Sequence, residues 1–343
     1  MESIKTRILK KLLETDGYLS GQDLCEQLGV SRTAVWKYMK QLKEEGYEIE
    51  AVQNKGYCLK DVPDVLGESE IKSRLHTRWA GQTLYYYDEI DSTNTQIKRL
   101  AEEDAPHGTL AVADYQSRGK GRRGRAWDSP HGSAIYMSIL FRPEIRPDRA
   151  SMLTLVIGLS VTQAIRSNLG LQAQIKWPND VVLNGKKLVG ILTEMSAQMN
   201  YIEYLVTGIG INANLREFPE ELADKATSLQ KEIGHKVNRS ALIAECMKKI
   251  EENYETFVKT QDLSGMMEAY QEVLVNQDQQ VRVLEPGHEY TGIARGINAM
   301  GELLVEREDG TISAVFTGMY RRKDVRRSNR FMWRQCLRTE ILF

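Results

Sequence analysis

The first 62 residues contain three segments with helical periodicity followed by a hairpin, an order of elements found in few folds. Apolar residues recur at helical spacing within residues 4–13, a second short helix is expected before Gly29, and a third begins at Ser31, a good N-cap residue. Two short strands then flank the turn at 54–56. This pattern indicates a winged helix-turn-helix, so we predict a separate N-terminal domain over residues 1–62.

The third helix of this domain would be the recognition helix, whose N-terminal residues reach base edges in the major groove. The residues expected to contact DNA are Ser20, Ser31, Arg32, Thr33, Trp36, Lys37, Lys40 and Lys55. Over residues 1–60 the ten basic residues barely exceed the nine acidic ones, so phosphate contacts alone would bind DNA weakly and we expect dimerisation to add affinity. A winged helix used for protein contacts is the alternative.

From residue 63 onward the pattern becomes mixed, which indicates an α+β fold. A linker is expected over 61–68, and residues 63–273 are predicted to form one domain around a mixed sheet. Its expected strands are 84–90, 109–116, 134–141, 187–195 and 201–209, and its long helices are 152–169 and 240–258. The sequence has no βαβ unit with a GxGxxG turn, which argues against a Rossmann domain.

The C-terminal part has two sections. Residues 274–320 hold short alternating strands and the turn Asp309-Gly310, which predict a small all-β barrel. Residues 321–343 hold eight basic residues against two acidic ones and show no clear period. We therefore expect this atypical basic tail to lie outside the fold.

Charge and cysteine content exclude several classes of function. The formal net charge is -1, so any nucleic-acid-binding surface must be local. The four cysteines, Cys25, Cys58, Cys246 and Cys336, lack metal-ligand or redox spacing, which argues against a zinc site or a disulfide framework. No signal stretch is visible, and no run approaches the roughly 20 apolar residues of a membrane span. We expect a cytoplasmic protein without membrane association.

A basic, glycine-rich loop at 116–125 is the first candidate for chemistry. Five of the nine residues from Ser117 to Arg125 are basic and three are glycine. Glycine lets the backbone approach an anion, and arginine binds phosphate through two hydrogen bonds. Such a loop, with Trp127 beyond it, suits a polyphosphate or an acyl phosphate. The alternative is a solvated loop or a nonspecific nucleic-acid contact.

A hairpin is predicted within residues 176–192, because Asn184-Gly185 is the commonest two-residue turn signal. Pairing across that turn places Asp180 and Lys187 on one face as diagonal neighbours, roughly 7–8 Å apart. Lys187 could then hold and polarise a carboxylate, and Asp180 could bind a metal or orient a group. A bulge would undo this register, and an ordinary surface ion pair is the alternative.

Two further segments are weaker candidates. The segment Asp91-Ser92-Thr93-Asn94 follows a strand and could form hydrogen bonds with a compact polar group such as a ureido group. The same residues also form a good helix N-cap. The segment 208–214 alternates glycine with isoleucine. This permits close approach of a ligand to the backbone, or simply tight strand packing.

The motifs GKGRRGR, KWPND, KKLVGIL and GIGIN, in this order behind a winged helix, resemble those of the bifunctional biotin–protein ligases that are also biotin-operon repressors. The resemblance spans residues 1 to about 320. It implies a central domain of the class II aminoacyl-tRNA synthetase and biotin ligase type, followed by an SH3-like barrel. It also implies a two-step reaction in which biotin and ATP with Mg²⁺ give biotinyl-5′-AMP, and a carrier lysine then takes the biotin.

By residue-wise match, the resemblance assigns roles within these motifs. Catalysis is expected to rest on Lys187, Arg122 and Asp180, and Asp180 is also the expected metal ligand. Biotin is expected to contact Ser92, Thr93, Asn94, Gln116, Gly119, Lys120, Gly121, Arg122 and Lys187. ATP is expected to contact Arg122, Arg123, Arg125, Trp127, Asn179, Lys187, Gly210 and Asn212.

The resemblance also implies partners and regulation. The carrier would be the biotin carboxyl carrier protein of acetyl-CoA carboxylase, and the adenylate would be both intermediate and corepressor. Adenylate-bound protein would form a homodimer on operator DNA and repress genes of biotin biosynthesis and transport. Two alternatives remain: a lipoate-type ligase, which shares the catalytic fold, and a non-catalytic biotin-sensing repressor, which needs only the pocket and the winged helix.

Overall fold

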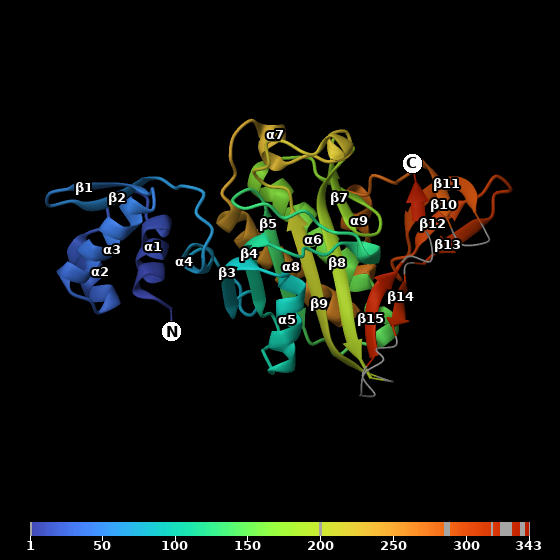
Figure 1. Cartoon of the computed structure of the whole chain (residues 1–343), viewed down its shortest axis with the longest axis horizontal. Helices are drawn as coiled ribbons and strands as arrows, with labels where there is room; N and C mark the ends of the chain where they lie inside the picture. The colour runs from blue at the N-terminus through green and yellow to red at the C-terminus, as the bar shows by residue number, and fades with distance from the viewer. Residues whose placement is uncertain are drawn as a thin grey trace.

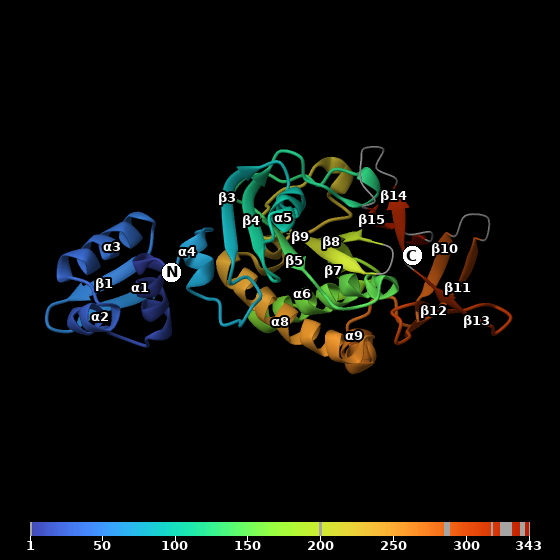
Figure 2. The same cartoon turned by 90° about the horizontal axis from the view of Figure 1, so that it is seen from below.

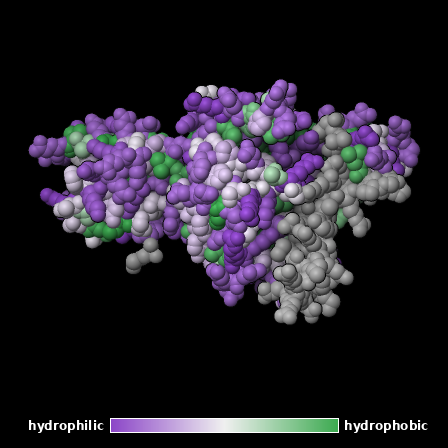
Figure 3. Space-filling view, viewed as in Figure 1, coloured by the Kyte–Doolittle hydropathy of each residue, from purple (hydrophilic) through white to green (hydrophobic). Residues whose placement is uncertain are grey.

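Three parts follow one another along the longest axis of the molecule (Figure 1). The structure, a computed structural model, describes residues 2–198, 201–284 and 289–316, with the backbone of three short strands at 318–322, 331–336 and 340–342. The N-terminal helices lie at one end, the large sheet in the middle, and a small β-sheet at the other end. Where Figure 3 shows described residues, the surface is mostly hydrophilic with scattered hydrophobic side chains.

The N-terminal part is a winged helix-turn-helix, as its periodicity predicts. Its elements are α1 (Ile4–Glu14), α2 (Gly21–Leu28), α3 (Arg32–Glu44), β1 (Glu48–Val52) and β2 (Gly56–Asp61). The side chains of Ser20 and Ser31 accept backbone N–H groups in the first turns of α2 and α3, which fixes where these helices begin. Their apolar faces meet α1 in a core around Ile8, Leu24 and Leu42.

A nine-stranded sheet forms the middle of the molecule. Its strands are β3 (Leu84–Ile90), β4 (Leu110–Gln116), β5 (Ile135–Phe141), β6 (Gln174–Lys176), β7 (Asp180–Leu183), β8 (Lys186–Ala197), β9 (Ile202–Ile211), β14 (Gly318–Arg322) and β15 (Phe331–Cys336). Their order is β14-β15-β8-β9-β5-β4-β3, and β6 joins through β7, which pairs with β8. The sheet is mixed, as predicted, because β3 and β4 are parallel whereas β4, β5, β9 and β8 pair antiparallel.

Helices cover both faces of this sheet (Figure 2). The helices of this part of the chain are α4 (Glu68–Lys72), α5 (Thr93–Glu102), α6 (Met152–Leu169), α7 (Leu229–Ile233), α8 (Arg239–Thr260) and α9 (Met267–Glu272). α6 and α8 pack together on one face, and α5 lies on the other. By length and composition Pro147–Leu169 could cross a membrane, which the sequence analysis did not anticipate, but 83% of its apolar window is buried inside the protein. α6 is therefore the core helix of this fold.

The small β-sheet part agrees with the predicted all-β unit. Its strands are β10 (Gln280–Leu284), β11 (Tyr290–Ile297), β12 (Leu303–Glu306), β13 (Ile312–Val315) and β16 (Glu340–Leu342), in the order β13-β12-β11-β10-β16. All the pairings within it are antiparallel.

The expectation that residues 321–343 lie outside the fold is wrong for their described strands. β15 pairs with the edge of β8, and β16 pairs with β10. β14 pairs with β15, so residues 318–320 extend the central sheet rather than the small β-sheet. The physical reason is that a sheet edge offers unpaired N–H and C=O groups to any extended segment, whatever the period of its side chains.

His107, a partly buried histidine, makes the stability of the fold depend on pH. Its ring packs against Trp79, Phe141 and Tyr254, and its Nδ1 accepts a hydrogen bond from the Arg142 backbone N–H at 3.0 Å. Burial, and secondarily the charge of Arg142, lowers the pKa of His107 from 6.5 to about 4. Below pH 6.5 the unfolded chain therefore binds a proton that the native state takes up only near pH 4, so stability falls as the pH falls through this window.

On acidification from pH 7 to pH 4.5, we expect protonation linked to His107 to lower the free energy of unfolding by about 1–2 kcal/mol. This is less than the whole pKa shift would give, because the ring is partly exposed to solvent. Urea unfolding of the wild type and of His107→Gln at both pH values measures this contribution. The variant should lose less stability on acidification than the wild type. An equal loss in both proteins would contradict the assignment.

Candidate functional site

A pocket of about 780 Å³ opens where several segments far apart in the sequence meet. It is lined by the start of α5, the loop after β4, the β7–β8 hairpin, strands β8 and β9, and residues 215–226. The predicted ligand residues that line it are Ser92, Thr93, Asn94, Gln116, Lys120, Gly121, Arg122, Arg125, Trp127, Asn179, Asp180, Lys187, Gly210 and Asn212. A concave site of this volume suits a small-molecule ligand.

Buried polar side chains form a hydrogen-bonded network at one end of the pocket. Gln116 Oε1 accepts a hydrogen bond from the Thr93 backbone N–H at 2.9 Å. Ser138 Oγ lies 2.7 Å from Thr93 Oγ1 and 2.6 Å from Asn94 Oδ1. Ser92 is the N-cap residue of α5, yet its side chain makes no capping hydrogen bond. The N-cap interpretation is therefore right for the backbone and leaves these side chains facing the cavity, where they can bind a compact polar head.

Glu194, on β8, lies beside this network and is not predicted from the sequence. Its side chain is 1% exposed, accepts a hydrogen bond from Asn94 Nδ2 at 3.0 Å and forms an ion pair with Lys98 Nζ at 2.8 Å. An ionised carboxylate only accepts hydrogen bonds, so Asn94 must turn its NH₂ group towards Glu194 and its oxygen towards Ser138. Glu194 thereby fixes the orientation of a pocket amide. The only local signal is an acidic residue shortly after the apolar run at 188–192.

Glu194→Gln is expected to raise the KM for the ligand of this polar end about tenfold, because a glutamine can also donate and no longer fixes the orientation of Asn94. The KM for a ligand bound elsewhere in the pocket should change little. Adding Lys98→Met removes both charges of the ion pair, so the double variant should recover the melting temperature without recovering the KM. Recovery of both quantities would mean that charge balance, and not the orientation of Asn94, is what Glu194 supplies.

The β7–β8 hairpin has the turn that the sequence predicts, and the predicted register holds for the two residue pairs next to the turn but not at Asp180. Asn184 and Gly185 have φ values of 51° and 76°, and Val182 lies opposite Lys187. A bulge follows, beyond which Asp180 lies opposite Gly190. Lys187 Nζ nevertheless lies 2.7 Å from Asp180 Oδ1. Because both side chains are partly exposed, this ion pair is weak, and an anionic ligand can take the place of Asp180 at low cost.

The backbone of Lys187 also pairs with a segment outside the hairpin. Its N–H donates to the Lys225 carbonyl at 2.8 Å, and its carbonyl accepts from the Thr227 N–H at 2.9 Å. Residues 215–226, which sequence analysis did not assign to the site, form a wall of the pocket that includes Phe218 and Leu222. The backbone pairing of Lys187 with Lys225 and Thr227 holds this wall next to the ammonium group of Lys187.

Trp127 lies on a floor made by two glycines. Gly190 and Gly210 are paired residues of β8 and β9. A Cβ at Gly190 would stand 2.6 Å from the Trp127 ring, and one at Gly210 would stand 2.7 Å from it. Lys187 Nζ lies 5.4 Å from the centre of the same ring. An aromatic surface beside a cation is suited to a planar base that carries a phosphate.

The basic loop folds back on itself at the mouth of the pocket. Residues Arg122–Gly124 form a short 3₁₀ turn, closed by the Gly121 N–H, which donates to the Arg125 carbonyl at 2.8 Å. Lys120 Nζ donates to Thr95 Oγ1 at 2.6 Å.

Three predicted loop residues differ in their placement. Arg122 Nη1 donates to Asn179 Oδ1, which links the loop to the KWPND motif. Gly119 does not appear among the residues that line the pocket; a Cβ there would meet Ser129 Oγ at 2.6 Å, so this glycine is needed for the close packing at the base of the loop. The side chain of Arg123 lies outside the described residues.

Most of the residues predicted to contact DNA are exposed on the winged helix. Arg32, Thr33, Trp36, Lys37 and Lys40 are exposed along α3, and Lys55 is exposed in the β1–β2 turn. Trp36 is 60% exposed, which is unusual for a tryptophan unless it meets a partner. Ser20 and Ser31 are occupied as N-caps, so the structure gives them a role inside the domain.

Within the described ranges no group of three or more His, Cys, Asp or Glu side chains could hold a metal ion. Asp180 remains the predicted ligand. Mg²⁺ is commonly held by one or two carboxylates together with substrate phosphates and water. A single partly exposed carboxylate beside a basic loop fits an ion that arrives with a nucleotide.

Three family models match successive parts of the chain. Residues 5–58 match an HTH domain, residues 86–212 match the biotin/lipoate A/B protein ligase family, and residues 278–318 match the biotin protein ligase C-terminal domain. These ranges fall on the winged helix, the central sheet and the small β-sheet in turn.

The chain is also similar to whole proteins. It is 41% identical to the bifunctional ligase/repressor BirA of Bacillus subtilis (strain 168), over 85% of this chain and 90% of that protein. It is 32% identical to the bifunctional ligase/repressor BirA of Escherichia coli (strain K12), over 88% of this chain and 92% of that protein. Among solved structures, the biotin protein ligase from Aquifex aeolicus in complex with biotin and ATP has a TM-score of 0.60 and 33% identity, over 69% of this chain and 97% of that one.

Proposed function

The chain belongs to the family of bifunctional biotin ligases and repressors, and we propose that it activates biotin with ATP and passes the biotinyl group to a lysine of a carrier protein. One observation carries this proposal. The buried polar network around Asn94 and the cation of Lys187 face one pocket, covered by a basic glycine-rich loop. A ligand with a neutral polar head and an anionic tail fits this pocket, because its head can bind to the polar network and its tail can pair with Lys187.

The polar network is assigned to the ureido head of biotin. The oxygens of Asn94 and Gln116 are acceptors for its N–H groups, and Ser92 and Thr93 offer hydroxyls. Lys187 takes the biotin carboxylate in place of Asp180. The basic loop, from Lys120 to Arg125, lies over the region where the carboxylate and the phosphates meet.

The first step joins the biotin carboxylate to ATP. A carboxylate oxygen attacks the α-phosphorus, pyrophosphate leaves, and biotinyl-5′-AMP forms. Lys187 and Arg122 neutralise the charge that develops on the phosphate oxygens. Mg²⁺ bound with the nucleotide would be held by Asp180 and would neutralise phosphate charge as well. Asn179, Gly210 and Asn212 lie in the same pocket and are assigned to the nucleotide, with Trp127 as the surface for adenine.

The second step transfers biotin to the carrier. The uncharged amine of a carrier lysine attacks the acyl carbon, AMP leaves, and an amide forms. Before that step the mixed anhydride is open to hydrolysis. The basic loop, together with the wall at 215–226, excludes water from it.

The exposed face of α3 is assigned to operator DNA, with Lys55 in the wing beside it. Adenylate-bound protein is proposed to form the homodimer that binds the operator in the cytoplasm, and the carrier to be the biotin carboxyl carrier protein of acetyl-CoA carboxylase. Operator affinity in a gel-shift experiment should then rise when biotin and ATP are both present. An affinity insensitive to both would contradict the corepressor role.

The ligase proposal is tested with the full chain, biotin, MgATP and a biotin carrier domain. The carrier should gain the mass of one biotinyl group only when all components are present, and excess lipoate should not compete. Binding of biotin without transfer would instead favour the non-catalytic sensor. Transfer of lipoate in place of biotin would favour the lipoate-type ligase.

A further inference from the structure

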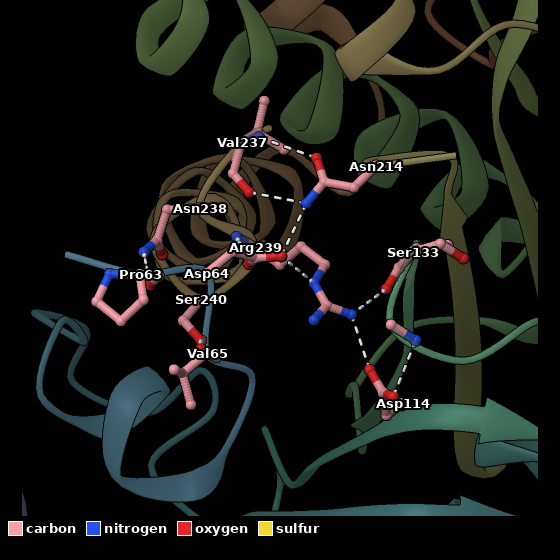
Figure 4. Close-up of polar contacts among 12 residues, drawn as sticks. Pro63, Asp64, Val65, Asp114, Ser133, Asn214, Val237, Asn238, Arg239 and Ser240 are labelled. Carbon is pink, nitrogen blue, oxygen red and sulfur yellow. Dashed lines mark hydrogen bonds and ion pairs between the residues drawn. The ribbon is translucent and has the colours of Figure 1, made fainter. Parts of the chain in front are cut away.

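The segment that joins the winged helix to the central part, residues 62–67, is packed against both. Val62 and Val65 pack on the core of the N-terminal domain, whereas Leu66 is part of the central core. The start of α8 holds the backbone of the segment, because Ser240 Oγ donates to the Val65 carbonyl at 2.8 Å. The linker therefore has one defined seat on the central part (Figure 4).

Asp64 is the charged residue at the centre of this seat. Its Oδ1 accepts a hydrogen bond from the Arg239 backbone N–H at 2.9 Å. Its Oδ2 accepts from Arg239 Nε at 2.9 Å and from Asn214 Nδ2 at 2.8 Å. The side chains of Asp64 and Arg239 are 10% and 5% exposed. A buried ion pair with this many hydrogen bonds is strongly destabilised when one partner is removed, so the arrangement holds its geometry firmly.

The hydrogen bond between Asn214 and Asp64 connects the linker to the glycine-rich end of β9, which lines the pocket. Asn214 closes the motif that begins at Gly208, and it lies two residues after Asn212, which lines the pocket. The backbone N–H of Asn214 donates to the Ser133 carbonyl at 2.5 Å. Asp64 thus holds the side chain of Asn214 (Figure 4). The backbone of Asn214 joins the two loops beside the pocket.

A second arm reaches the loop that carries Trp127. Arg239 Nη1 donates to Asp114 Oδ1 at 2.8 Å, and Asp114 Oδ2 accepts from the Gly132 N–H at 2.9 Å. Asp114 lies on β4 two residues before Gln116 of the polar network. Through Arg239, the linker carboxylate is therefore connected to both the strand that presents Gln116 and the loop after Trp127.

We propose that Asp64 is a positioning residue for the ligand pocket, through which the seating of the interdomain linker and the affinity for biotin and nucleotide are coupled. The inference rests on the proposed function only in taking biotin and ATP as the ligands. Coupling between two sites is reciprocal. If the linker contact supports the pocket loops, then ligands that order those loops must also hold the linker more firmly, and with it the C-terminal end of the DNA-binding domain.

The first test compares Asp64→Asn with Ser240→Ala in the full chain. Asparagine keeps the shape of Asp64 but turns an NH₂ group towards the donors of Arg239 or Asn214, so biotin Kd should rise about fivefold to tenfold, near the lower end of measured coupling. Ser240→Ala removes one hydrogen bond to the linker backbone but leaves the contacts of Asp64 with Arg239 and Asn214 in place. It should leave biotin Kd within about twofold of the wild type, although both variants lose stability.

The deciding measurement of the second test uses the wild type, so it does not depend on how well a variant folds. Hydrogen exchange of peptides covering 62–67 and 237–240 is measured with and without biotin plus MgATP. Exchange should slow at least severalfold with ligand, and Asp64→Asn should abolish that difference. Unchanged exchange in the wild type overturns the inference.

A failure of the coupling can be distinguished from a failure of the proposed ligase function. If the wild type biotinylates the carrier while Asp64→Asn and Ser240→Ala bind biotin equally well, the coupling is wrong and the proposed function stands. If the wild type fails to bind biotin, the proposed function is wrong, and the coupling fails with it.

Discussion

Replacing Lys187 by alanine is expected to lower kcat/KM for biotin adenylation by about 100-fold to 1,000-fold, the range seen when one preorganised donor is removed from a developing negative charge. Lys187 Nζ is held 2.7 Å from Asp180 and 5.4 Å from the centre of the Trp127 ring, so its charge is already in place before substrate binds. Biotin-dependent release of pyrophosphate measures the effect. The melting temperature should hardly change, because the lost ion pair is partly exposed and worth under about 1 kcal/mol.

Lys186 offers a matched control for this prediction. It is the neighbouring lysine of the same hairpin, but its Nζ donates to the Ala223 carbonyl at 3.2 Å and it does not appear among the residues lining the pocket. Lys186→Ala removes the same net charge and should leave adenylation within about twofold of the wild type. If the two alanine variants lose activity equally, the effect is one of general charge and Lys187 has no special role.

Replacing Gly208 by alanine is expected to raise biotin Kd about 100-fold, roughly the loss of two hydrogen bonds to a buried polar head. A Cβ on Gly208 would come within 2.9 Å of Asn94 Cγ. Asn94 has no room to retreat, because it is 4% exposed and bonded to Ser138 and Glu194. The added methyl group must therefore push the Asn94 amide out of the polar network.

Gly158 serves as the control glycine. It lies buried inside α6, where an added Cβ would meet only Ile191 Cδ1, at 3.8 Å, an ordinary contact distance. Gly158→Ala should leave biotin Kd unchanged and raise stability by about 0.5–1 kcal/mol through the better helix propensity of alanine. ATP affinity should persist in Gly208→Ala. Loss of ATP binding together with biotin binding would mean that the substitution disrupts the fold and not the polar end of the pocket.

The ends of several elements are predictable because local chemistry sets them. α6 runs from Met152 to Leu169 as its apolar stretch predicts, and α3 begins after Ser31, whose side chain accepts the Ala34 N–H. Asn184-Gly185 makes the predicted hairpin turn because both residues tolerate positive φ. Each of these signals acts within a few residues of itself, so a sequence displays it directly.

The candidate site is predictable only where its residues stand in motifs. Ser92, Gln116, Asp180 and Lys187 come from segments whose composition already indicates chemistry, and the structure brings them to one pocket. The β7–β8 bulge, which puts Asp180 opposite Gly190, was not predictable from the turn residues. The wall at 215–226 carries no motif and was missed for that reason.

The sequence by itself determined the winged helix, the long helices and most central strands, and the groups that can bind a polar head and a phosphate. The tertiary structure alone decided which side chains hold those groups in place. Asn94 and Glu194 are 100 residues apart, and Asp64 lies 150 residues from Asn214 and 175 from Arg239. Such partners cannot be predicted from a local sequence pattern, because a buried hydrogen bond or ion pair depends on distance in space. Spacing along the chain does not show which distant segments the sheet and its helices bring together.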